Sequence, residues 1–222
     1  VQSGVASGPT WKDVTVNSVI RSASGHITLI ASGSLSQIAT GDITTAGDIV
    51  LNASNGTILQ SDGTLVQSSM GNINVHATSN VTIGGLNAST GAVRIVSTGG
   101  SVFDGGDSNV DVVASRARMS VGVGVGTLGL SGNGLETTLG SVAIQAGSGG
   151  IHLLETDGLT VDSVTFSVEQ VEDDGTSSTE TPPALSDLTT STNGSIILKT
   201  AGAGNLVLNN GADADGLAIS AN

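Results

Sequence analysis

A seven-residue phrase recurs along this chain and constrains its fold more than any other feature. It begins with glycine or serine, places aliphatic residues at its third and fifth positions, and ends with a small residue, as in Gly25–Ala31 and Gly47–Ala53. Further copies start at Gly71, Gly91, Ser108, Gly126, Gly140 and Gly194. Because the copies recur with a period of roughly 20 residues, the pattern is typical of stacked β-solenoid turns.

The composition favours a narrow interior. The 222 residues include 33 glycines but only one tryptophan, two phenylalanines and no tyrosine. Since a wide core needs bulky side chains to reach the packing density of proteins, Val, Ile, Leu and Ala must fill a thin one. Alternation within the phrases predicts short strands, and glycine pairs between them predict corners. Together these features predict an all-β, parallel β-helix of about nine to eleven coils.

The two aliphatic positions of each phrase are expected to point into the solenoid, and the residue between them outward. In this register Leu51 and Ile95 belong to the core, whereas Val50 and Arg94 lie on the outer surface. A charged substitution at Leu51 or Ile95 is therefore expected to destabilise the fold far more than a change at Val50 or Arg94.

The regular pattern is interrupted once. Residues 168–192 are acidic, rich in Ser and Thr, and contain Pro182-Pro183, which favours an exposed loop or linker;. Residues 1–167 are expected to form one β-helix repeat unit, and residues 193–222 to continue the β-helix as the start of a next unit. The phrase at Gly194 echoes its counterpart at Gly25, which indicates a second, longer period. Repeat-like sequence at both ends predicts a fragment of a longer protein.

The charge of the chain excludes some partners. The formal net charge is −13, so nucleic acid phosphates and anionic lipids are expected to be repelled;. Cysteine is absent, and stability must come from packing and backbone hydrogen bonds;. No apolar run approaches the ~20 residues of a membrane helix, so no membrane insertion is expected.

Several phrases carry a resemblance to known families. Gly47–Ile58 and Gly71–Ala77 resemble the coil repeats of filamentous-haemagglutinin-type large exoproteins. The stretch Gly132–Val161 is similar to segments of giant tandem-repeat bacterial surface adhesins. The resemblance implies a right-handed β-helix in a secreted protein of the bacterial cell surface. It implies a shaft of a large adhesin or surface fibre that contributes to cell attachment. The implied partners are neighbouring repeat units of the same longer chain, surface carbohydrate, and proteins of a host or partner cell.

Calcium is the one cofactor that the residues suggest. Asp104 and Asp107, and likewise Asp213 and Asp215, place carboxylates in glycine-containing turns, and calcium prefers such oxygen ligands. Neither segment matches a known calcium loop, and aspartate also occurs in turns for its own local hydrogen bonds. A calcium-stabilised module and a metal-free one both stay open.

No enzymatic activity is expected, and a carbohydrate-active β-helix enzyme (a polysaccharide lyase or glycosidase) is the alternative. Glycosidases need paired carboxylates, usually beside aromatic platforms. Carboxylates gather at Asp104, Asp107 and Asp111, at Glu155 and Asp157, and at Asp213 and Asp215, but the aromatic residues Trp11, Phe103 and Phe166 are scattered. The histidines share no repeat offset, which favours surface or corner roles.

Overall fold

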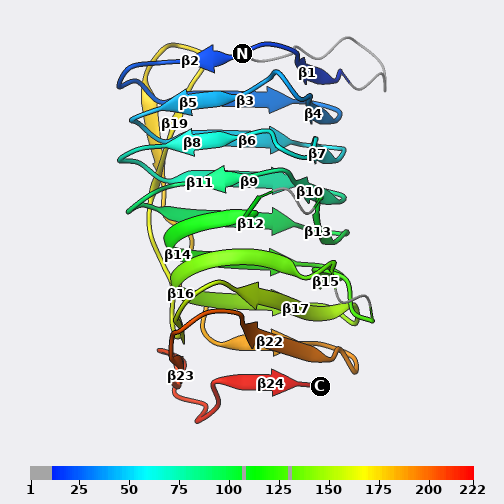
Figure 1. Cartoon of the computed structure of the whole chain (residues 1–222). Helices are drawn as coiled ribbons and strands as arrows, with labels where there is room; N and C mark the ends of the chain where they lie inside the picture. The colour runs from blue at the N-terminus through cyan, green and yellow to red at the C-terminus, as the bar shows by residue number, and fades with distance from the viewer. Residues whose placement is uncertain (1–11, 107–108, 130–131) are drawn as a thin grey trace.

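The protein is a parallel β-solenoid of about six turns, seen in a computed structural model that describes residues 12–106, 109–129 and 132–222 (Figure 1). The solenoid strands stack on three sides, and the strands of the inner turns pair in parallel with their counterparts one turn earlier and one turn later. None of the described residues forms a helix that could cross a bilayer. The predicted all-β parallel solenoid is confirmed.

The first side contains the longest ladder. It consists of β3 (Ile27–Ala31), β6 (Ile49–Ala53), β9 (Ile73–Ala77), β12 (Ala92–Ser97), the later halves of β14 (Val112–Val121) and β16 (Leu135–Ala146), β21 (Leu188–Thr190) and β24 (Ile219–Ala221). Two further short strands belong to this side: β18 (Leu159–Val161) pairs with β16, and β23 (Leu206–Leu208) pairs with β18. Along the chain, β18 comes before β21 and β23 comes before β24.

The other two sides are built from shorter strands. The second side holds β1 (Val14–Val16), β4 (Leu35–Gln37), β7 (Ile58–Gln60), β10 (Val81–Ile83), β13 (Val102–Asp104), β15 (Gly124–Val125), β17 (Gly150–Glu155) and β22 (Ile196–Thr200). The third holds β2 (Ile20–Arg21), β5 (Ile43–Thr45), β8 (Val66–Ser68), β11 (Leu86–Asn87) and the first halves of β14 and β16, which the end of β17 follows.

The core is a set of aliphatic columns, as the composition predicts. One column on the first side runs through Leu29, Leu51, Val75, Ile95, Met119, Ile144 and Leu188, each at most 1% exposed. Because each residue contacts its equivalents in neighbouring turns, small side chains fill the interior without large aromatic rings.

The predicted nine to eleven coils are wrong, because not every copy of the phrase marks a new turn. In the copy that starts at Gly126, residues 126–129 lie in a connection and not a strand, and the strand residues of the copy that contains Val112 lie on the third side. In the first-side ladder their place is taken by Ala117 and Met119, which no phrase covers. Equivalent positions in successive turns of this side are Ile27, Ile49, Ile73, Val93, Ala117 and Val142.

The glycines that open the phrases at Gly71 and Gly91 permit close stacking of the corners. A Cβ atom on Gly91 would lie 2.0 Å from the carbonyl oxygen of Gly71. A Cβ on Gly71 would lie 2.5 Å from the carbonyl carbon of Gly47. Both distances are far below a normal contact, so the corner of each of these turns passes over a residue without a side chain.

An antiparallel hairpin lies across the outside of the first side. Residues 162–187, here called the strap, leave the ladder after Val161 and re-enter it at Leu188. Within the strap, β19 (Val168–Val171) pairs with β20 (Ser177–Glu180), and the hairpin runs back along the turns toward β3 (Figure 1). The segment 168–192, expected to be a loop or linker, therefore divides into this packed hairpin and the solenoid strand β21.

The strap buries a second apolar cluster. Phe166, Val164 and Val168 cover Val50, Ala92 and Ala143, which point outward from the ladder, and Leu185 packs at the edge. The backbone N–H groups of Glu169 and Val171 donate to Asp48 Oδ2 and Thr28 Oγ1, at 2.7 and 2.9 Å. Val50 is only 2% exposed. The expectation that Val50 is a tolerant surface position is wrong, because a segment from much later in the sequence covers it.

Three of the six basic residues lie beneath or beside the strap. Arg94 and Arg118 are neighbours in the ladder, and Arg94 forms a salt bridge with Glu180 of β20. The Arg116 guanidinium lies 6.0 Å from the ring centroid of Phe166. Burial and the charge of Arg94 lower the pKa of Arg118. The acidic strap thus partly balances a local excess of positive charge.

Candidate metal centres

Two groups of three carboxylates occur among the described residues, and each group could hold a cation. In both groups every residue offers one oxygen atom, and these three oxygens lie within 4.8 Å of one another. Oxygen-only donor sets of this kind suit calcium.

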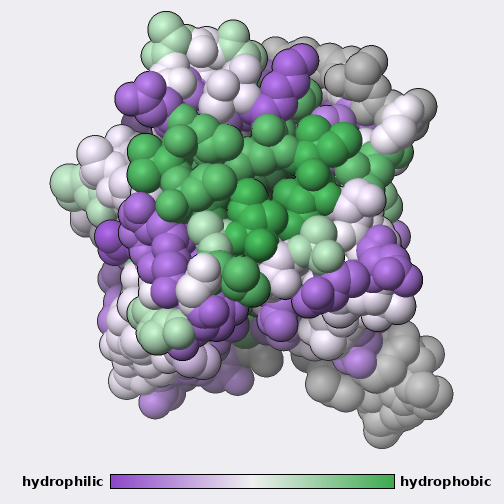
Figure 2. Space-filling model, turned by 90° about the horizontal axis from the view of Figure 1, so that it is seen from below, coloured by the Kyte–Doolittle hydropathy of each residue, from purple (hydrophilic) through white to green (hydrophobic). Residues whose placement is uncertain are grey.

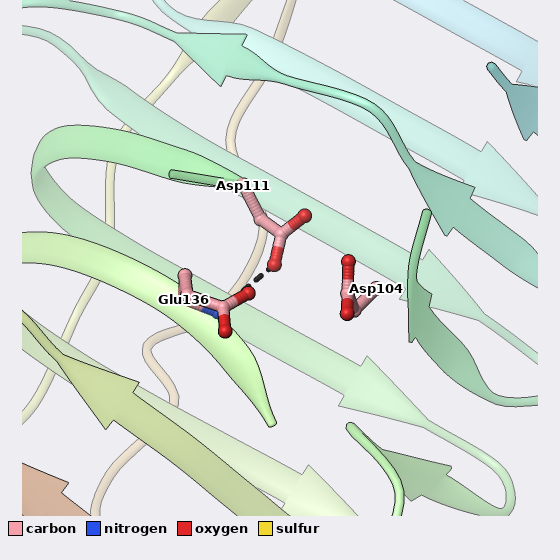
Figure 3. A group of neighbouring side chains, drawn as sticks. All are labelled: Asp104, Asp111 and Glu136. Carbon is pink, nitrogen blue, oxygen red and sulfur yellow. Dashed lines mark hydrogen bonds between the residues drawn. The ribbon is translucent and has the colours of Figure 1, made fainter. Parts of the chain in front are cut away.

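The first group lies where the second side turns into the third. Asp104 ends β13, Asp111 directly precedes β14, and Glu136 is the second residue of β16. Figure 3 shows the three side chains gathered between neighbouring turns. The Glu136 backbone N–H donates to Asp111 Oδ2 at 2.9 Å, so the carboxylate of one turn accepts from the backbone of the next.

Asp111 is the electrostatic centre of the first group. It is 1% exposed, and burial raises its pKa to about 9, with further contributions from the carboxylates of Asp104 and Glu136. The hydrogen bond from the Glu136 backbone acts in the opposite direction. Near neutral pH this group therefore retains a proton that Asp111 can share with Glu136, unless a cation replaces it.

The second group lies at the base of the strap. Asp187 directly precedes β21, and Asp213 and Asp215 lie in the connection between β23 and β24. This connection and the strap interrupt the first side at equivalent points in successive turns, because β18 pairs with β23 and β21 pairs with β24. The sequence therefore brings Asp187 against a loop that lies one turn later.

Asp187 is held rigidly. It is 1% exposed and has a φ of 66°. Its Oδ1 accepts a hydrogen bond from the Gly211 backbone N–H at 3.0 Å, while its buried Oδ2 has no hydrogen-bond partner among the described residues unless Asp187 and Asp213 share a proton. Burial raises the pKa of Asp187, and the neighbouring carboxylates of Asp213 and Asp215 raise it further.

The structure separates the four predicted calcium ligands into these two groups. Asp104 lies in the first and Asp213 and Asp215 in the second, whereas Asp107 falls outside the described residues. Sequence reasoning did not assign Asp111, Glu136 or Asp187 as ligands. A signal exists for Asp111 and Glu136, because they are separated in the sequence by the length of one turn, like the ladder partners Val112 and Thr137. Asp187 and Asp213 are closer in the sequence than one turn of that part of the ladder, so the spacing does not indicate their contact.

The other candidates from the sequence lie elsewhere. Glu155 is fully buried and accepts from Thr137 Oγ1 and the Leu139 backbone N–H, at 2.8 and 3.1 Å. Burial raises its pKa to about 7. Phe166 belongs to the strap and is 6% exposed because it packs against the ladder, so it is not available to stack on a sugar. His26 Nδ1 accepts from the Asp48 backbone N–H at 3.0 Å, a structural role.

The chain matches no protein-family model, and no curated protein or solved structure is significantly similar to it. The interpretation of the site therefore depends on its own geometry.

Asp111 is expected to make the fold less stable as pH rises. In the unfolded chain this residue loses its proton near its ordinary pKa of 3.8, whereas the folded protein keeps the proton up to about 9. The folded state thus binds more protons across this interval, and its stability is greatest below the lower value. Glu155 contributes a fall in the same direction between its ordinary pKa of 4.5 and about 7.

Urea unfolding of wild type and Asp111→Asn, measured from about pH 5 to 8.5 with a chelator, checks this expectation. The amide keeps the hydrogen bond from Glu136 but cannot ionise. We expect the fall of unfolding free energy to be less steep in the variant, by up to about 1.4 kcal/mol per pH unit. Equal slopes for the two proteins would contradict the assignment.

Proposed function

We propose that this chain is a shaft segment of a large secreted adhesin or fibre of the bacterial cell surface. Its contribution to attachment is length and stiffness, built by stacking turns on a continuous aliphatic core. The turns wind in a right-handed sense, the hand of about 98% of parallel strand crossovers. The net charge of −13 supports a role away from nucleic acid and anionic lipid;.

The observation that carries the proposal is the uncovered core at the C-terminal end. Val161 is fully buried, but Leu208, its ladder partner one turn later, is 49% exposed. Leu188 is likewise fully buried, while its partner Ile219 is only partly buried. Figure 2, which views this end directly, shows the resulting apolar surface. Aliphatic columns that run through the molecule thus reach its end without a cover.

The backbone at this end supports the same proposal. Each of β22, β23 and β24 pairs on one edge, with β17, β18 and β21, and within the described residues no strand pairs with the other edge. An open edge above exposed aliphatic columns favours the addition of another parallel turn. The phrase at Gly194, which repeats the one at Gly25, indicates that a further unit of the same kind fits.

A tandem protein made of two directly joined copies of the chain tests the proposal. We expect a single rod in small-angle X-ray scattering, longer than one copy by about 30 Å for about six turns of about 4.8 Å;. Binding of a hydrophobic dye should fall per copy, because one apolar end becomes covered. Two lobes that move independently, with unchanged dye binding per copy, would contradict a shaft.

Leu208→Asp in the first copy is the matched control. The side chain is half exposed at the end of a single chain, so the substitution should leave that chain folded. In the tandem protein the carboxylate would be buried between the copies, which is strongly unfavourable. We expect the control tandem to bind the dye like two separate chains and to lose its single rod shape.

A further inference from the structure

We propose that Asp187, Asp213 and Asp215 form a calcium site that fastens the base of the strap to the last turn of the solenoid. The site is independent of the shaft function. It joins the residue at which the strap returns to the ladder with the connection that follows β23.

The geometry provides an oxygen-only donor set with a large negative charge. Three carboxylate oxygens lie within 4.8 Å of one another. At neutral pH the repulsion between three carboxylates at this spacing is unfavourable unless a proton or cation offsets it. Calcium takes about six to eight oxygen ligands in flexible geometry, so three carboxylates can supply part of its shell and water the rest.

The second observation is the buried oxygen of Asp187. This residue is 1% exposed, yet none of the described residues donates a hydrogen bond to its Oδ2, while Oδ1 is satisfied by Gly211. Leaving a buried carboxylate oxygen unsatisfied is costly. A bound cation would satisfy it, and the exposed Asp213 and Asp215 leave a path for the ion from solvent.

The two groups differ in their access to solvent. Asp213 and Asp215 are exposed, whereas Asp111 is buried and Asp104 and Glu136 are half-buried. We therefore assign calcium to the second group, which an ion can reach directly.

Calorimetric titration and thermal unfolding of the whole chain with CaCl2 test the site. We expect one saturable site per chain and a melting temperature higher by about 5–10 °C at a calcium concentration about 100 times the Kd. Asp213→Asn combined with Asp215→Asn should abolish both effects. Because these residues are exposed, the variant should still fold.

Two controls separate the site from its alternatives. Asp173→Asn with Asp174→Asn removes the same charge from the exposed turn of the strap, and Glu136→Gln alters the first group; both should keep the calcium response. The proposal is overturned if calcium produces no saturable heat at millimolar concentration. It is also overturned if NaCl of equal ionic strength gives the same shift in melting temperature, or if Glu136→Gln abolishes binding.

Discussion

Leu51→Ala is expected to lower the free energy of unfolding by about 2–5 kcal/mol, the usual cost of truncating a fully buried leucine. Leu51 is fully buried between Leu29 and Val75 of the adjacent turns. The substitution leaves a cavity in the aliphatic core, and the neighbouring turns cannot close it without shifting the ladder. Urea unfolding followed by circular dichroism measures the loss.

Leu59→Ala provides the matched control. Leu59 lies on β7 of the same turn but points outward and is 49% exposed. Its truncation should change the free energy of unfolding by no more than about 0.5 kcal/mol. Similar losses for Leu51→Ala and Leu59→Ala would contradict the inward and outward assignment of the columns.

Phe166→Ala is expected to release the strap, with a loss of about 3 kcal/mol in the stability of this segment. The ring is 6% exposed and packs in the cluster that contains Val50, Ala92 and Ala143. Because the solenoid core lies on the other side of the ladder, we expect local release and an intact solenoid.

Hydrogen exchange gives a direct measurement of strap release. The amides of Glu169 and Val171 bond to side chains of the solenoid, so their exchange should accelerate in Phe166→Ala. The amide of Leu51, in the ladder, should keep its protection. Phe103→Ala is the control, since Phe103 is partly buried on β13 outside the strap. Unchanged protection of Glu169 and Val171 in Phe166→Ala would show that the ring does not hold the strap.

Packing of the strap explains why the outer surface differs from expectation. Alternation in the sequence places Val50 on the outside of the ladder, and the structure confirms that direction. Direction does not determine exposure, however, because Val164, Phe166 and Val168 return to cover this residue. A charged substitution at Val50 should therefore be damaging, contrary to the expectation from the repeat alone.

The candidate metal site could be predicted only in part, because it too depends on contacts between segments that are distant in the sequence. Local sequence identifies Asp213 and Asp215 as turn carboxylates, but Asp187 joins them through the stacking of successive turns. Whether two carboxylates from successive turns meet in space depends on the number of residues in each turn. That length differs even in the regular part of the first side, where the turn from Ile73 to Val93 is shorter than the turn from Ala117 to Val142.

The amino-acid sequence by itself determined that the chain forms parallel strands around a thin aliphatic core. That information is local, because alternation within each strand directs side chains and the absence of large aromatic residues limits the interior. Only the tertiary structure decided the number of turns, the position of the strap and the grouping of the carboxylates. These features depend on contacts between residues one or more turns apart, which the lengths of the connections set and short sequence patterns do not record.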